Sequence, residues 1–337
     1  MDRGPAERGR PLRACGRSGA VGREPGRRMG KVLPGWLAIA LTVIGGVGSA
    51  AQNLANAELG ERTGHPVVGG LVNNTGGLLL VLVGLVALPS MRTGLRALWR
   101  ARLPWWTYLG GLCGTFFIAA GTYVVPVLGV AVFTIAQVAG NSAGGLAVDR
   151  TRLAPAGRLG LTGPRLTGAL LGIGAVALAQ LGRPVGDLAL GLVLVGVVGG
   201  ALIAVQGALN GRLSATGNPA AATATNFVVS ASSMAALAAV TGVLGRLGRV
   251  DWPADWYLYV GGALGVGITV VVLLGIRSVG LLRTGLALVA GQLGGALLLD
   301  LRPGGPGASL AVLAGALLTL LAVVISGRAA RGAPAAT

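Results

Sequence analysis

Residues 51–59 read AQNLANAEL, and residues 205–213 read VQGALNGRL. Both stretches carry the pattern Gln-x-x-x-Asn-x-x-Leu, so that Gln52 and Asn56 return as Gln206 and Asn210. Each stretch lies inside a long apolar run, where a polar side chain is costly unless it is hydrogen-bonded. The return of this pattern at an offset of 154 residues indicates that a membrane-spanning unit has been duplicated within the chain.

Further matches follow in the same order along both copies. Pro66 and Asn73 return as Pro219 and Asn226, and the pattern G-G-x-x-G at 110–114 returns at 261–265. Four more residues return at an offset of 151, namely Gly129, Gly140, Gly144 and Asp149, as Gly280, Gly291, Gly295 and Asp300. An ordered series of matches across five apolar runs predicts two copies of one scaffold.

Ten apolar runs follow the first 33 residues, and most are near the roughly 20 residues that a helix needs to cross a bilayer. Lipid offers the backbone no hydrogen-bonding partner, so we expect each run to be a helix. The predicted spans are 34–57, 66–88, 105–125, 127–148, 165–182, 187–209, 220–242, 256–276, 279–299 and 308–326. We expect Pro126 to break the first long pair of spans, and Arg277 and Arg283 to break its counterpart.

The predicted fold is an all-α polytopic membrane protein with two five-helix repeats, at 34–182 and 187–326. Because five is an odd number, the second repeat must enter the membrane from the opposite side. Inverted repeats of this kind let a carrier expose a midplane site to each side of the membrane in turn.

Charge predicts the orientation and the environment. The formal charge is +17, yet only 11% of residues are charged and 53% are hydrophobic. The basic residues lie in short breaks between apolar runs, which indicates a lipid bilayer as the partner and argues against nucleic acid. With a cytoplasmic N-terminus, 22 of the 27 basic residues fall inside and five fall outside, so the positive-inside rule predicts that both termini are cytoplasmic. The five outside are Arg62, Arg183, Arg246, Arg249 and Arg302.

The two ends of the chain are predicted to be tails. Residues 1–33 hold nine basic residues among Gly and Pro, and we expect them to form a disordered cytoplasmic tail. Binding of this tail to anionic lipid is the alternative role, and Met29 is an alternative start of translation. Residues 327–337 are predicted to be a short cytoplasmic tail.

Two five-helix halves that each open with Gln-x-x-x-Asn and then Pro-x6-Asn resemble the drug/metabolite transporter superfamily. Within it they resemble the bacterial YdcZ-like branch, as do WWTYLGG at 105–111 and its echo WYLYVGG at 256–262. The resemblance covers residues 34–326 and implies a carrier of the bacterial plasma (inner) membrane with a central cavity between the halves. In the small cation-exporting relatives that the resemblance points to, a carboxylate lies deep in the first helix. This chain has the amides Gln52 and Asn56 in that helix instead.

Six paired amides are the candidate substrate-binding residues: Gln52, Asn56, Asn73, Gln206, Asn210 and Asn226. Residues four apart share a helix face, and intramembrane polar side chains usually face the bundle interior. Amides offer donors and acceptors without charge, which favours a neutral or zwitterionic polar solute. Interhelical hydrogen bonding that only holds the bundle is the alternative. Second-rank candidates are Gln137, Asn141 and Gln292.

Other features are interpreted more simply. The G-x-x-x-G pairs that recur in both halves predict close helix packing, and the six tryptophans near span ends predict an interfacial belt. Asp149 and Asp300 lie where spans end, and His65 is expected to be exposed. Glu58 is either a solvated end residue or a group that titrates at the mouth of a cavity.

The leading function is secondary transport of a small polar metabolite by alternating access around an amide-lined midplane cavity. A membrane scaffold or regulator that transports nothing is the alternative. One histidine, His65, and two cysteines, Cys15 and Cys113, provide no nucleophile–base pair and no cluster of metal ligands, so we expect neither an enzyme nor a cofactor or metal. Substrate, direction, ion coupling and a possible homodimer stay open.

Overall fold

The computed structural model describes residues 33–151, 153, 163–179, 181, 187–279 and 281–328. The predicted tails lie outside the described residues, apart from Leu33 at one end and Gly327 and Arg328 at the other. Three arginines of the predicted loops, Arg152, Arg158 and Arg183, also lie outside them.

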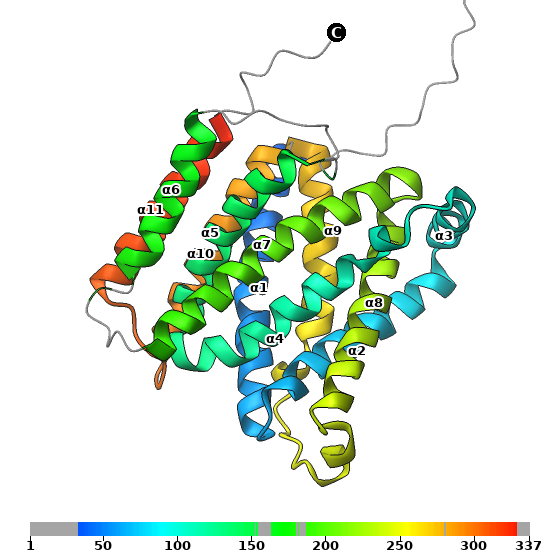
Figure 1. Ribbon diagram of the computed structural model, residues 1–337, viewed down its shortest axis with the longest axis horizontal. Helices are drawn as coiled ribbons and strands as arrows, with labels where there is room; N and C mark the ends of the chain where they lie inside the picture. The colour runs from blue at the N-terminus through cyan, green and yellow to red at the C-terminus, as the bar shows by residue number, and fades with distance from the viewer. Residues whose placement is uncertain are drawn as a thin grey trace, which may run out of the picture. The chain divides into compact units, whose positions relative to one another are not determined.

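Within the described residues, ten long helices coincide with the ten predicted spans (Figure 1). The first half holds α1 (Gly35–Arg62), α2 (Pro66–Ala87), α4 (Gly110–Leu128), α5 (Val130–Asp149) and α6 (Gly163–Ala179). The second holds α7 (Asp187–Thr216), α8 (Pro219–Val240), α9 (Gly261–Val279), α10 (Leu281–Asp300) and α11 (Leu310–Arg328). Shorter helices are α3 (Pro89–Ala101), η1 (Trp105–Leu109), η2 (Leu244–Arg249) and η3 (Trp256–Tyr259).

Length and composition fit a membrane. Six helical segments are long and apolar enough to cross one: α1, α2, η1 with α4, α5, α7 and α8. Shorter apolar stretches occur in α6, α9 and α11. The surface of these helices is apolar too, with Val83 63% and Leu317 69% exposed, which water would penalise and lipid tails would not. The chain is therefore an all-α polytopic membrane protein.

Contacts between helices repeat when the two halves are exchanged. In the first half α1 packs against α9 and α10, and in the second half α7 packs against the corresponding helices α4 and α5. The counterparts α2 and α8 pack against each other, as do α6 and α11, which lie side by side at one edge (Figure 1). Each half therefore makes its main contacts with the other half.

Recurrent glycines let the backbones meet at the closest crossings. A Cβ atom on Gly291 of α10 would overlap the carbonyl oxygen of Val43 on α1. A Cβ atom on Gly140 of α5, the counterpart of Gly291, would overlap the carbonyl oxygen of Val197 on α7. These crossings confirm the prediction that the repeated G-x-x-x-G pairs are packing seams.

The largest apolar core among the described residues draws on α1, α4, α5, α6, α7, α10 and α11. Phe133 and Leu293 are fully buried in it, and the rings of Phe117 and Phe133 stack with centroids 5.4 Å apart. This core surrounds the crossings of the two halves, so side-chain packing and glycine contact support the same interface.

Two local features differ from the prediction. The chain does not break at Pro126: α4 continues to Leu128, and the break lies at Gly129, whose φ of 85° is readily adopted only by glycine. The connection at 89–104 also contains a helix, α3, whose apolar side chains Met91 and Leu98 are buried. Seven residues make two helical turns, so these side chains share one face, a pattern present in the sequence that the prediction missed.

The two faces of the molecule are named here by one residue each. The Glu58 face carries the α1–α2 turn, the α8–α9 connection and the α10–α11 connection. The Arg212 face, at the other end of the helices, carries the α7–α8 turn and α3 (Figure 1). The charge distribution predicts that the Glu58 face is external.

Candidate functional site

The first amide group joins α1 to α2. Gln52 Nε2 donates a hydrogen bond to Asn73 Oδ1 over 2.9 Å, and Asn73 is 1% exposed. Asn56, one helical turn beyond Gln52, is also buried. The three predicted amides of the first half therefore meet at one place.

The second amide group joins α7 to α8 in the same way. Gln206 Nε2 donates to Asn226 Oδ1 over 2.8 Å, and Asn210 Nδ2 donates to the same oxygen over 3.2 Å. All three side chains are half-buried. The Gln–Asn hydrogen bond is thus repeated between the halves with nearly identical length.

Each amide group faces a helix of the opposite half. A Cβ atom built on Gly261 of α9 would lie 2.5 Å from Asn56 Oδ1, and one on Gly265 would lie 2.9 Å from Gln52 Nε2. In the other half, a Cβ atom on Gly110 of α4 would lie 2.9 Å from Asn210 Oδ1. Because these glycines have no side chain, the amides lie close to the backbone of the opposite half. The amides therefore form part of the contact surface between the two halves, which we call the seam.

The amide groups offer hydrogen-bonding capacity without charge. Each Asn or Gln side chain provides two donors and a two-lone-pair acceptor, and the observed bonds use only part of that capacity. Asn210 Oδ1 is buried and has no hydrogen-bond partner among the described residues. A polar solute in the seam would find both donors and acceptors there.

A second polar cluster bridges α2, α4 and α8. Asn73 Nδ2 donates to Asn74 Oδ1 over 3.3 Å, and Asn74 Nδ2 reaches the carbonyl oxygen of Ser230 over 3.5 Å. Thr115 Oγ1 lies 2.7 Å from Ser233 Oγ. Ser230 and Ser233 thus belong to a hydrogen-bonded network that adjoins the first amide group.

The second-rank candidates lie elsewhere. Gln292 Nε2 donates to Ser49 Oγ over 3.0 Å at the α1–α10 crossing, and Asn141 is exposed. Gln137 is buried on α5, and its Oε1 atom has no hydrogen-bond partner in the described part of the chain. The structure therefore does not bring these three residues to the amide groups.

Glu58 belongs to an ionic network that links the halves. It pairs with Arg62 one turn away, accepts a 3.0 Å hydrogen bond from Tyr257 Oη, and lies 3.4 Å from Arg302 Nη1. Arg62 Nη1 also donates to Asp255 Oδ2 over 2.5 Å. We call these five residues the Glu58 network. Desolvation, and then the hydrogen bond to Glu58, raise the pKa of Tyr257, so the phenol keeps its proton and remains a donor.

The position of Glu58 in the first half corresponds to Arg212 in the second, at the offset of the Gln–Asn pattern. The Arg212 guanidinium lies over the ring of Trp106, 5.3 Å from its centroid, and Trp106 corresponds to Tyr257. The tryptophans were predicted to form an interfacial belt. That role requires exposed rings, and four of them are strongly exposed: Trp36, Trp99, Trp105 and Trp256. Trp106 has a further role, because its ring makes a cation–π contact with Arg212.

Asp300 has a role that its place at a helix end did not reveal. Its carboxylate accepts hydrogen bonds from the backbone N–H groups of Val130 and Ala131, both over 2.9 Å, at the start of α5. The side chain is 2% exposed. A carboxylate suits the positive end of a helix, so Asp300 ties α10 of one half to α5 of the other.

Three cavities are lined by residues other than the six amides. One of about 180 Å³ borders Glu58, Asp300 and Arg302 at the Glu58 face, and one of about 410 Å³ is an apolar groove between α5, α6 and α7. A third, of about 460 Å³, lies beside the α1–α2 turn. Within the described residues, no three His, Cys, Asp or Glu side chains gather as metal ligands.

Comparison with known families gives one match. The family model described as "Putative inner membrane exporter, YdcZ" matches residues 37–178 and 191–325, which leaves out only the ends and a short connection between the halves. Neither a curated protein nor a solved structure matches the chain. Ten long helices, two related halves and this match agree on a transporter of the inner membrane. The chain belongs to the YdcZ family of the drug/metabolite transporters.

Proposed function

We propose that the protein moves a small neutral or zwitterionic metabolite by alternating access, and that the two amide groups bind it. The observation that supports this most directly is the position of the amides. Gln52 and Asn56 of α1 face α9, while Gln206 and Asn210 of α7 face α4. A rocking motion of one half against the other changes these contacts first.

In this proposal the amides exchange partners. With the seam closed, Gln52 bonds to Asn73 and Gln206 bonds to Asn226. When one face opens, the solute's own donors and acceptors replace these bonds, so no amide is left unsatisfied in a dry environment. The absence of a carboxylate from both amide groups disfavours a permanently cationic solute.

The two faces act as gates. Breaking the Glu58 network separates the end of α1 from η3 and from the α10–α11 connection, which opens the Glu58 face. Lifting Arg212 from Trp106 separates the end of α7 from η1, which opens the other. Each gate joins one half to the other, as alternating access requires.

A binding screen followed by counterflow tests the proposal. Purified protein is screened by thermal shift against neutral, zwitterionic, anionic and cationic metabolites, since a ligand of the native state raises the unfolding midpoint. Hits are then assayed for counterflow in liposomes. The double variant Gln52→Ala, Asn210→Ala is expected to lose at least 90% of counterflow.

Asn141→Ala is the matched control, because Asn141 is an exposed amide that the structure does not bring to either amide group. It is expected to keep the wild-type rate. Full activity in the double variant would remove the amides from the site, and an absence of hits at saturating ligand would instead favour the scaffold interpretation.

A steric variant tests the same site without removing an amide. In Gly261→Ala the new methyl group would meet Asn56 Oδ1 and Asn73 Oδ1, 2.5 and 2.7 Å from the ideal Cβ position. Counterflow is expected to fall at least tenfold. Gly267→Ala on the same helix is the control, because its Cβ would have no neighbour within 4 Å, and it is expected to transport normally.

A further inference from the structure

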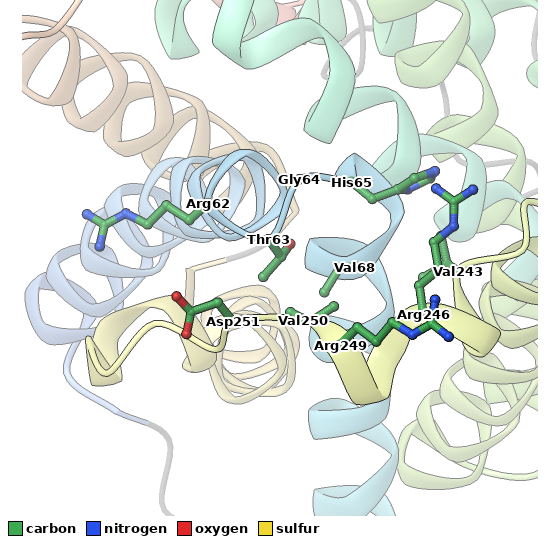
Figure 2. A pocket seen from close by; sticks show the side chains of 10 residues that line it. All are labelled: Arg62, Thr63, Gly64, His65, Val68, Val243, Arg246, Arg249, Val250 and Asp251. Carbon is green, nitrogen blue, oxygen red and sulfur yellow. The ribbon is translucent and has the colours of Figure 1, made fainter.

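The cavity beside the α1–α2 turn has basic walls (Figure 2). Arg62, Arg246, Arg249 and His65 line it, against one carboxylate, Asp251. Its volume is about 460 Å³. Two buried valines, Val68 and Val243, also border it and exclude water from one side. This combination concentrates positive potential at one place on the Glu58 face.

The charges divide into two groups. Arg62 pairs with Glu58 and Asp255, and Figure 2 shows it on the same side of the cavity as Asp251. His65, Arg246 and Arg249 lie together on the other side (Figure 2). Arg246 and Arg249 are exposed and form no ion pair with the part of the chain that the structure describes. Two guanidinium groups are thus available to a ligand.

The equivalent position in the second half is closed. His65 caps α2 by accepting from Val67 N over 3.3 Å, and Asn218 caps α8 by accepting from Ala221 N over 2.8 Å. At Asn218, however, α3 covers the turn, because Asn218 Nδ2 donates to the carbonyl oxygen of Ser90 over 2.7 Å. At His65, η2 borders the cavity instead. The turn at Asn218 is therefore covered by a helix, whereas the turn at His65 borders a cavity walled by arginines.

The distribution of arginines strengthens the case. The face predicted to be external carries five basic residues, and three of them, Arg62, Arg246 and Arg249, line this one cavity. A guanidinium presents a rigid fork of donors that matches the oxygens of phosphate. We propose that Arg246, Arg249 and His65 form a binding site for a phosphate-class anion, either free or as the headgroup of an anionic lipid. This site does not depend on the proposed transport function.

Thermal shift in an uncharged detergent tests the site with two probes. One probe is inorganic phosphate, with chloride at equal ionic strength as its blank, and the other is phosphatidylglycerol, with phosphatidylcholine as its blank. We expect at least one probe to raise the wild-type midpoint by about 3–6 °C at saturation. A response to phosphate identifies a free anion as sufficient, and a response to phosphatidylglycerol alone identifies a lipid headgroup.

Matched variants locate the effect. Arg246→Gln with Arg249→Gln is expected to lose the shift, and His65→Asn, which keeps a capping side chain as at Asn218, is expected to halve it. Arg92→Gln with Arg96→Gln removes two exposed arginines from α3 and is expected to leave the shift intact. Arg246→Lys with Arg249→Lys keeps the charge and serves if the glutamine pair does not fold; we expect it to retain part of the shift.

Two results would overturn the site. One is the failure of both probes to shift the wild-type midpoint. The other is a shift of equal size in the wild type and in the Arg246→Gln, Arg249→Gln variant. Neither result bears on counterflow, so this site and the proposed transport function are tested separately.

Discussion

The two faces of the molecule use different chemistry at equivalent positions. At the Glu58 face, the end of α1 is held by an ionic network that includes Tyr257 and Arg302. At the Arg212 face, the end of α7 is held by a cation over the ring of Trp106. Between them, the Gln–Asn hydrogen bonds are nearly the same length in both halves. The shared geometry lies in the seam, and the difference lies at the ends.

This difference has a physical cause. The seam is built by both halves, and both copies keep the same amides there. The two faces meet different surroundings, so the copies can differ there. A contact made of exposed ion pairs is weakened by salt, because mobile ions screen it. A guanidinium stacked on an indole is less sensitive, since part of its attraction is contact with the ring.

The largest loss of stability is expected at the glycines where two helix backbones are in contact. In Gly140→Ala or Gly291→Ala, the added methyl group would overlap the carbonyl oxygen of Val197 or of Val43, so the helices must separate. Overpacking of this kind costs about 1–3 kcal/mol or more. We expect either variant to lower the unfolding midpoint by at least about 5 °C or to prevent accumulation of folded protein.

The controls for this prediction lie on the same two helices. A Cβ atom on Gly145 or Gly294 would have no neighbour within 4 Å, and alanine favours a helix over glycine by about 1 kcal/mol. Gly145→Ala and Gly294→Ala should therefore leave the midpoint unchanged or raise it. Equal effects of all four substitutions would show that glycine content, rather than the crossings, determines stability.

The sequence was sufficient to predict the helical spans and the residues that share a helix face. It was not sufficient to predict contacts between residues far apart in the chain. Hydropathy placed all ten spans, and the spacing of Gln52 and Asn56 correctly placed them on one helix face, which meets α9. The pairing of Arg62 with Asp255 joins residues 193 apart, and that of Glu58 with Arg302 joins residues 244 apart. A single sequence carries no signal for such pairs.

Two other omissions have local causes. The helix break was expected at Pro126, but α4 continues for two residues beyond this proline, and Gly129 has the positive φ at which the helix ends. Asp300 looked like an ordinary helix end, because its partner is the start of a helix in the other half. Recognising it required the arrangement of the halves in space.

The prediction of intermediate size distinguishes the contacts at the two faces. Glu58→Gln removes the shared anion of its network, and we expect amide hydrogen exchange in residues 53–62 and 254–260 to rise about twofold to fivefold. Raising sodium chloride from 0.05 to 0.5 M should produce a similar rise in the wild type and little change in the variant. Arg212→Gln should affect residues 104–112 instead, with weak dependence on salt. Identical salt responses at both faces would contradict the difference between the ionic contact and the Arg212–Trp106 contact.

The smallest effect is expected for Tyr257→Phe. The variant keeps the ring and removes one hydroxyl, which donates to Glu58 and lies 3.0 Å from Arg62. The ion pairs of Glu58 remain, so exchange at the Glu58 face should rise less than twofold. A rise as large as that of Glu58→Gln would make the phenol, rather than the ion pairs, the main contact of the Glu58 network.

The glycine crossings also make the packing of each half depend on the other half. The groove around Gly46 on α1 is occupied by α10, and the groove around Gly140 on α5 is occupied by α7, so each half completes the other. One five-helix unit on its own would present bare backbone grooves to lipid. Neither half can therefore complete its helix packing until the other half is present.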